Sequence, residues 1–316
     1  QPLAAHILLT SAMEKNSAAQ AIKVKDKDTI PILVTTLDTA GNPIGNTPFI
    51  LTRDEGTARD SSYTGWKSLG SVLFLNGNAA QQWGAADVFY GVTRADGTFP
   101  VNVSADNGDH TLHGAGVKNT LTASLYETSS ATSAIPVIFT VVSSPDSDKA
   151  NMWGHMPETF TASNGASFKR PLLYSELSTT TDTSIYTETN EDWYLVKNVN
   201  QGRGACPMVQ MATAADSQTL YGDHPGGALA TDLGLPLGKT WWAGDRKLNG
   251  QYIYWQYINF KTGKTGTTTS MSNSALQLCE TEPRQMNIAF SLLPRDENRG
   301  AAVVKKGESI AATVRV

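Results

Sequence analysis

The chain has 316 residues, of which 17% are charged, and its formal net charge at pH 7 is −4. Binding to nucleic-acid phosphates needs a basic face, so this balance argues against nucleic acid as a partner. The sequence has no apolar run of the roughly 18 residues that a spanning helix requires, so we expect no membrane insertion by this chain.

The first 145 residues show short β-strand patterns separated by turns. Residues 21–25 alternate apolar and charged side chains, and residues 30–37 are rich in β-branched side chains. Segment 38–43, Asp-Thr-Ala-Gly-Asn-Pro, has turn chemistry and precedes apolar segment 44–52, which predicts a β-hairpin. Further strand candidates lie at 72–75, 88–90, 99–103, 121–126 and 135–142. About seven short strands in such a segment predict an immunoglobulin-like β-sandwich over residues 1–145.

A polar segment at 143–148, Ser-Ser-Pro-Asp-Ser-Asp, marks the predicted boundary with a second domain, residues 146–316. Because the linker is short, we expect the two domains to lie close together. The second domain reads as mostly β with one or two short helices. Residues 226–233 predict one helix, ended by Gly234, and residues 309–316 predict a closing strand.

The chain contains two cysteines, Cys206 and Cys279. They fit one structural disulfide in an oxidising compartment, or two unrelated buried thiols. Zinc sites need close pairs of Cys or His, so these two residues predict no metal site.

The most aromatic stretch, residues 236–260, lies between the cysteines. Residues 252–260 have few polar positions, which is typical of a strand buried on both faces. Adjacent Trp241 and Trp242 cannot share one face of a strand, so we expect one in the core and one toward a loop. The loop from Trp241 to Gly250 is the predicted recognition surface, with binding residues Trp241, Trp242, Asp245, Arg246 and Lys247.

Catalytic motifs are not found in the sequence. There is no Gly-x-Ser-x-Gly elbow, and the segment 234–240 is one residue too short for a phosphate loop and contains Pro236. We therefore expect that the protein is not an enzyme.

Two segments resemble a known family. Residues 32–51, with a strand, Ala-Gly-Asn-Pro, a second strand and Pro-Phe, together with Ala-Asp-Gly-Thr at 95–98, resemble the immunoglobulin-like repeats of intimin/invasin-type (inverse autotransporter) bacterial adhesins. From Lys-Ala-Asn-Met-Trp-Gly-His-Met at 149–156 to the end, the chain resembles the adhesion domain of the invasin E type. Together the two resemblances cover nearly the whole chain.

The resemblance implies a mostly β protein, with an immunoglobulin-like β-sandwich followed by an α+β C-type-lectin-like domain. It also implies a disulfide between Cys206 and Cys279. In the family the second cysteine lies close to the C-terminus, whereas residues 280–316 follow Cys279 here, so a second β-sandwich is the alternative. The segment Glu282-Pro283-Arg284 lacks the third residue of calcium-dependent sugar-binding lectins, so we expect no calcium, no metal and no cofactor.

The resemblance further implies an adhesin, located on the bacterial cell surface or secreted, whose C-terminal domain binds a host-cell surface protein. We also expect a monomer. One alternative is a structural or self-association module of a bacterial surface rod, which predicts self-complementary surfaces. Another is a secreted hydrolase with an accessory immunoglobulin-like domain, which predicts a pocket with converging titratable groups.

Overall fold

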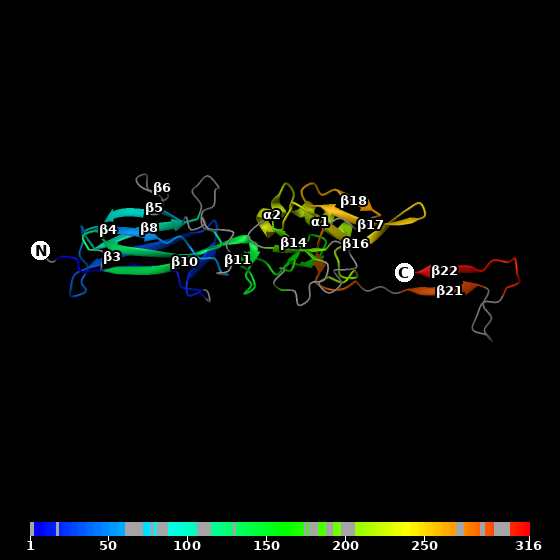
Figure 1. Ribbon diagram of the computed structural model, residues 1–316, viewed down its shortest axis with the longest axis horizontal. Helices are drawn as coiled ribbons and strands as arrows, with labels where there is room; N and C mark the ends of the chain where they lie inside the picture. Colours follow the sequence, from blue (N-terminus) through cyan, green and yellow to red (C-terminus); the bar gives the residue numbers. More distant parts are fainter. Residues whose placement is uncertain are drawn as a thin grey trace.

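The computed structural model shows an elongated molecule with a β-rich domain at each side of a central junction (Figure 1). Among the described residues, no helix is both long enough and apolar enough to cross a bilayer. The structure describes residues 3–16, 19–60, 72–76, 79–80, 88–105, 115–128, 131–173, 176, 183–187, 192–196, 206–269, 275–284, 288–293 and 304–316.

The first domain is a sandwich of two sheets. One sheet has the order β1 (His6–Thr10), β3 (Thr29–Leu37), β8 (Thr98–Ser104), β5 (Leu73–Asn76) and β6 (Ala79–Ala80). The other has the order β11 (Gly154–Met156), β10 (Thr132–Pro145), β9 (Lys118–Leu125), β4 (Pro48–Arg53) and β7 (Val88–Val92), with β2 (Ile22–Lys25) also paired to β10.

Alternating burial along the strands builds the core of this sandwich. In β3, Ile30, Ile32 and Val34 are buried while their neighbours in sequence are more exposed. These side chains belong to the same buried cluster as Phe49 of β4 and Phe89 of β7. Because both sheets send every second residue inward, the expected immunoglobulin-like sandwich is confirmed.

The predicted hairpin over residues 30–52 is wrong. The turn itself forms, because the Gly41 amide donates to the Asp38 carbonyl oxygen at 3.0 Å and Gly41 has a φ of +82°. However, β3 and β4 lie in different sheets. The connection carries the chain across the sandwich, so that the apolar faces of the two strands meet inside it instead of lying side by side.

The second domain contains a six-stranded mixed sheet, a smaller sheet and two helices. The large sheet has the order β14 (Thr183–Thr187), β15 (Asp192–Val196), β19 (Ala275–Gln277), β16 (Thr240–Asn249), β17 (Tyr252–Asn259) and β18 (Thr265–Thr268). The small sheet contains β12 (Thr159–Thr161), β13 (Ser167–Lys169) and β20 (Cys279–Glu280). The helices are α1 (Ala214–Asp223) and α2 (Ala228–Leu233). Helix α2 ends at Gly234, whose φ is +75°, as predicted.

The last two strands form a separate ribbon. β21 (Ala289–Leu293) and β22 (Ala311–Arg315) pair only with each other among the described residues, and Figure 1 shows them lying apart from the second domain. The predicted closing strand therefore exists, but it does not close the second domain.

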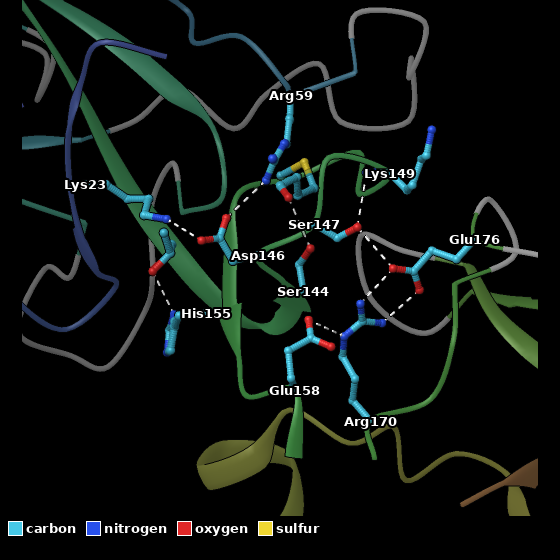
Figure 2. Close-up of polar contacts among 12 residues, drawn as sticks. Lys23, Arg59, Ser144, Asp146, Ser147, Lys149, His155, Glu158, Arg170 and Glu176 are labelled. Atoms are coloured by element: carbon cyan, nitrogen blue, oxygen red, sulfur yellow. Dashed lines mark hydrogen bonds and ion pairs between the residues drawn. The ribbon is translucent and has the colours of Figure 1, made fainter. Parts of the chain in front are cut away.

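Strand β10 connects the domains without a break. Its last residues pair in parallel with β11, which follows the boundary segment. A Cβ added at Gly154 would lie 1.7 Å from the Ser144 carbonyl oxygen, so only glycine allows this close pairing. Asp146 accepts from Lys23 at 2.8 Å and from Arg59 at 3.3 Å (Figure 2). These contacts hold the start of the second domain against the first.

A buried arginine ties the boundary segment to the second domain. The Arg170 side chain is 6% exposed and donates to both Glu176 carboxylate oxygens, at 2.7 and 2.8 Å, and to Glu158 at 3.0 Å (Figure 2). Glu176 also accepts from the Ser147 hydroxyl at 3.0 Å. One guanidinium therefore organises two carboxylates next to the junction.

Candidate adhesive surface

The aromatic stretch folds as the β16–β17 hairpin. Trp241 pairs with Ile258, and the pairing continues to Asn249 and Tyr252, with a register shift between Trp242 and Arg246. The connection is a two-residue turn in which Gly250 has a φ of +63°. The prediction of a loop from Trp241 to Gly250 is therefore wrong, because strand β16 covers residues 240–249.

Both adjacent tryptophans are buried. Trp241 is fully buried, packs 5.3 Å from the Phe260 ring and donates its indole N–H to the Pro236 carbonyl oxygen at 3.2 Å. Trp242 is 2% exposed and belongs to a different cluster, which also contains both cysteines. The pair does use two faces of the strand, but the prediction that one tryptophan faces the outside is wrong because both faces are covered.

The expected disulfide is confirmed. Cys206 and Cys279 are bonded, with an S–S distance of 2.01 Å and a Cα–Cα distance of 5.7 Å. Trp242 and Met211 are buried beside it. The bond thus joins the segment before α1 to β20, and it packs against Trp242 of the large sheet.

Asp245 and Arg246 make contacts within the domain. The Asp245 carboxylate accepts from the Ala214 amide at 2.8 Å, at the start of α1, and from Gln256 at 3.1 Å. The Arg246 guanidinium lies 3.4 Å from the centre of the Trp255 ring. These contacts show a structural role for Asp245, whereas the binding role predicted for Asp245, Arg246 and Lys247 stays a prediction.

The distal half of the hairpin carries large apolar side chains on its surface. Leu248, Tyr252 and Ile253 are 68%, 62% and 65% exposed. Leu248 pairs with Ile253 across the hairpin, so these two share one face, and Tyr252 lies on the other. We name residues 247–254 the hairpin tip. The prediction that residues 252–260 form a strand buried on both faces is wrong for this half of β17.

Both faces of the hairpin tip are exposed, because neither β18 nor β19 pairs with residues 247–254. Figure 1 shows the β16–β17 hairpin extending beyond the second domain, away from the first. Lys247, Asn249 and Gln251 are exposed around the apolar side chains. Gly250 is the first of the two turn residues, a position at which two-residue hairpin turns favour glycine, so the turn, although not the exposure, could have been found from the sequence.

Outside the hairpin, the described residues offer little that resembles a metal site or a catalytic site. Within the described residues, no three His, Cys, Asp or Glu side chains gather as a metal ion would need. A cavity of about 730 Å³ lies in the first domain, lined by residues 3–4, 44–48, Leu125, Glu127 and Thr128. Glu127 is the one titratable residue in that lining, so the cavity offers no set of converging acid and base groups.

Comparison with known proteins adds two family matches. Residues 27–142 match the model of a bacterial immunoglobulin-like domain, Bacterial Immunoglobulin-like 21, and residues 145–280 match the InvE adhesion domain. The chain has the two domains of an intimin/invasin-type adhesin. The expected order, with the immunoglobulin-like domain first and the adhesion domain second, is thereby confirmed.

A solved structure shares the fold of this adhesin. The structure of Yersinia pseudotuberculosis adhesin InvE matches with a TM-score of 0.68 and 24% identity, over 87% of this chain and 70% of that chain. Domains 4 and 5 of the S-layer protein SbsC match over 45% and 54% of the two chains, at 15% identity and a TM-score of 0.25, which is too low to carry an argument. No curated protein sequence matches the adhesin.

Proposed function

We propose that this adhesin binds a protein on the surface of a host cell through its C-terminal domain, and that the hairpin tip is the contact surface. The observation that carries the proposal is the exposure of Leu248, Tyr252 and Ile253 at the end of a projecting hairpin. Large apolar side chains surrounded by polar ones are typical of protein contact sites. Tyrosine is moreover enriched among residues that dominate binding energy.

Of the five binding residues predicted from the sequence, Lys247 alone lies within the hairpin tip. Trp241 and Trp242 support the hairpin from inside the domain, and Asp245 fixes the start of α1. Lys247 is part of the proposed surface, and Arg246 borders it. Lys247 is exposed at the tip, and Arg246 lies next to it in β16 with its guanidinium over Trp255.

We propose that binding needs no calcium. Arg284, the third residue of the segment Glu282-Pro283-Arg284, donates to the Met208 carbonyl oxygen at 2.9 Å and to that of Met211. This guanidinium therefore occupies the backbone oxygens around it and brings a positive charge to the segment. Both features oppose a cation site of the kind that sugar-binding lectins use.

The family also supports two further parts of the proposal. The chain acts without catalysis, and it acts at the bacterial cell surface or in secreted form. Support comes from the InvE adhesion domain, together with the lack of acid and base groups converging on the cavity in the described part of the first domain. We also propose that it acts as a monomer. A rod-forming role through self-association is the competing function, because an exposed apolar tip could also meet a second copy.

The test is binding of the fluorescently labelled chain to intact host cells. The double variant Leu248→Ser, Tyr252→Ser removes two apolar side chains of the tip, and we expect at least a 30-fold loss, which corresponds to about 2 kcal/mol. Tyr90→Ser is the matched control, because Tyr90 is 52% exposed in the first domain. Thermal unfolding of each variant checks that the fold is kept.

Three further arms separate the parts of the proposal. Protease treatment of the cells should abolish binding, while a calcium chelator should not change it. Binding that survives the double variant, or that falls equally with Tyr90→Ser, would place the contact elsewhere. If instead the double variant lowers the molecular mass in sedimentation experiments while cell binding persists, the tip is a self-association surface.

A further inference from the structure

The C-terminal ribbon exposes an apolar face. In β22 and the residues flanking it, Ile310, Ala312, Val314 and Val316 alternate with other residues and so share one side of the strand. Ile310, Val314 and Val316 are 40%, 59% and 84% exposed. An isolated two-stranded ribbon is marginal in water, so a ribbon with this face needs a covering layer.

The first domain begins with a ribbon of the same construction. There β1 pairs antiparallel with β3, and Leu9 lies opposite Val34, just as Phe290 of β21 lies opposite Val314 of β22. Each pair places an apolar residue of the first strand opposite a valine of the second. The strand order, the antiparallel direction and the pairing of an apolar residue with a valine therefore agree.

The turn before the second strand of each ribbon also agrees. In the first domain, the Asp28 amide donates to the Lys25 carbonyl oxygen at 2.9 Å. Before β22, the Glu308 amide donates to the Lys305 carbonyl oxygen at 3.0 Å. The sequences read Lys-Asp-Lys-Asp-Thr-Ile at 25–30 and Lys-Lys-Gly-Glu-Ser-Ile at 305–310. One constant shift in numbering relates the turns, the isoleucines and the valines, so the two segments repeat one local pattern.

The two strand pairs differ in how far their apolar residues are buried. In β3 the inward residues Ile30, Ile32 and Val34 are 0%, 2% and 0% exposed, because the second sheet of the sandwich covers them. Under the same shift they correspond to Ile310, Ala312 and Val314, which lie on the uncovered face. The ribbon thus has the inward pattern of a sandwich sheet without the opposing sheet.

We propose that β21 and β22 are the leading strand pair of a second immunoglobulin-like unit, and that their apolar face is the docking surface for the opposite sheet of that unit. The occupant is β-strand polypeptide continuous with Val316. The adhesion domain then lies between two immunoglobulin-like units. This inference stands independently of the proposed host contact.

The first test reads the coding sequence beyond the codon for Val316. The repeat predicts a turn rich in Asp, Gly, Asn or Pro directly afterwards, matching segment 38–43, and then strands with alternating apolar residues over about 100 residues. A stop codon at that point, or a continuation without alternating strands, would overturn the proposal.

The second test measures hydrogen exchange of the β22 amides in the natural chain extended by that unit. We expect at least 100-fold slower exchange of residues 311–315 than in the chain ending at Val316. Val314→Asp in the extended chain should abolish the protection, while Thr313→Asp, on the opposite side of the strand, should keep it. Equal exchange in both chains, or equal effects of both variants, would contradict the proposal. So would protection that depends on the concentration of the shorter chain, since it would make a second copy the occupant.

Discussion

Replacing Glu176 by glutamine should destabilise the second domain strongly. The substitution keeps the size of the side chain but leaves the Arg170 guanidinium, 6% exposed, with Glu158 as its remaining carboxylate partner among the described contacts. Glu158 is 67% exposed and is well screened by water. Breaking a buried ion pair from one side costs about 3–5 kcal/mol. For a domain of this size, about 3 kcal/mol lowers the melting temperature by roughly 6–12 °C.

Differential scanning calorimetry at pH 7 measures this effect, and hydrogen exchange at residues 158–173 assigns the transition to the second domain. Glu158→Gln is the matched control, and we expect it to cost about 0–1 kcal/mol because its carboxylate is exposed. The double variant Arg170→Met, Glu176→Gln should lose less than Glu176→Gln alone, since no buried charge remains. A loss from Glu176→Gln no larger than that from Glu158→Gln would refute the reasoning.

The same pair sets a direction for pH dependence. Burial raises the pKa of Glu176, but hydrogen bonds from Arg170 and the Leu173 amide outweigh it, so the pKa lies below its ordinary value of 4.5. The stabilisation is therefore fully present above about pH 4.5 and is lost as the pH falls through the lowered pKa. Glu176→Gln should remove this acid-dependent part of the unfolding curve.

Three other outcomes are expected. Replacing both Cys206 and Cys279 by serine should destabilise the second domain by about 4 kcal/mol in the chain-entropy model, measured by urea unfolding against the oxidised chain; a loss below about 1 kcal/mol would contradict it. Asp245→Ala should cost about 1 kcal/mol through the lost bond to the Ala214 amide, whereas Lys247→Ala should be silent in the same melts. Burial, followed by the neighbouring Asp216, raises the pKa of Glu280 to about 7, so the folded domain loses stability as pH rises from about 4.5 to 7; Glu280→Gln should flatten that slope, and an unchanged slope would point to another group.

Local patterns in the sequence identify the strands of the first domain well. Ile30, Ile32 and Val34 alternate with exposed residues, and the structure buries them as this period requires. The same patterns do not show which strands pair with one another. Residues 38–43 form the turn that their chemistry predicts, but the strands on each side join different sheets. Turn residues fix a local hydrogen bond, whereas the choice between one sheet and two depends on contacts with distant strands.

The same limit applies to the candidate surface. Trp241 and Trp242 looked like binding residues because aromatic side chains dominate both cores and contact sites. Their burial follows from α1, the disulfide and Phe260, which surround them from other parts of the chain. Ile253 lies in the stretch 252–260 that the sequence predicts to be core, yet it and its cross-strand partner Leu248 are exposed at the end of the hairpin. Sequence alone does not show how far a hairpin reaches beyond its neighbours.

The pairing of strand β10 determines how the first domain resists mechanical force. It pairs in parallel with β2, from Val137 opposite Ile22 to Thr140 opposite Lys25. When tension acts between the start of β2 and the end of β10, the two strands are drawn in opposite directions along their common axis. The hydrogen bonds between them then carry the load together, in shear, and do not open one after another. An adhesin under mechanical load bears this kind of force. The ion pair between Lys23 and Asp146 adds a further contact between β2 and the residue that follows β10.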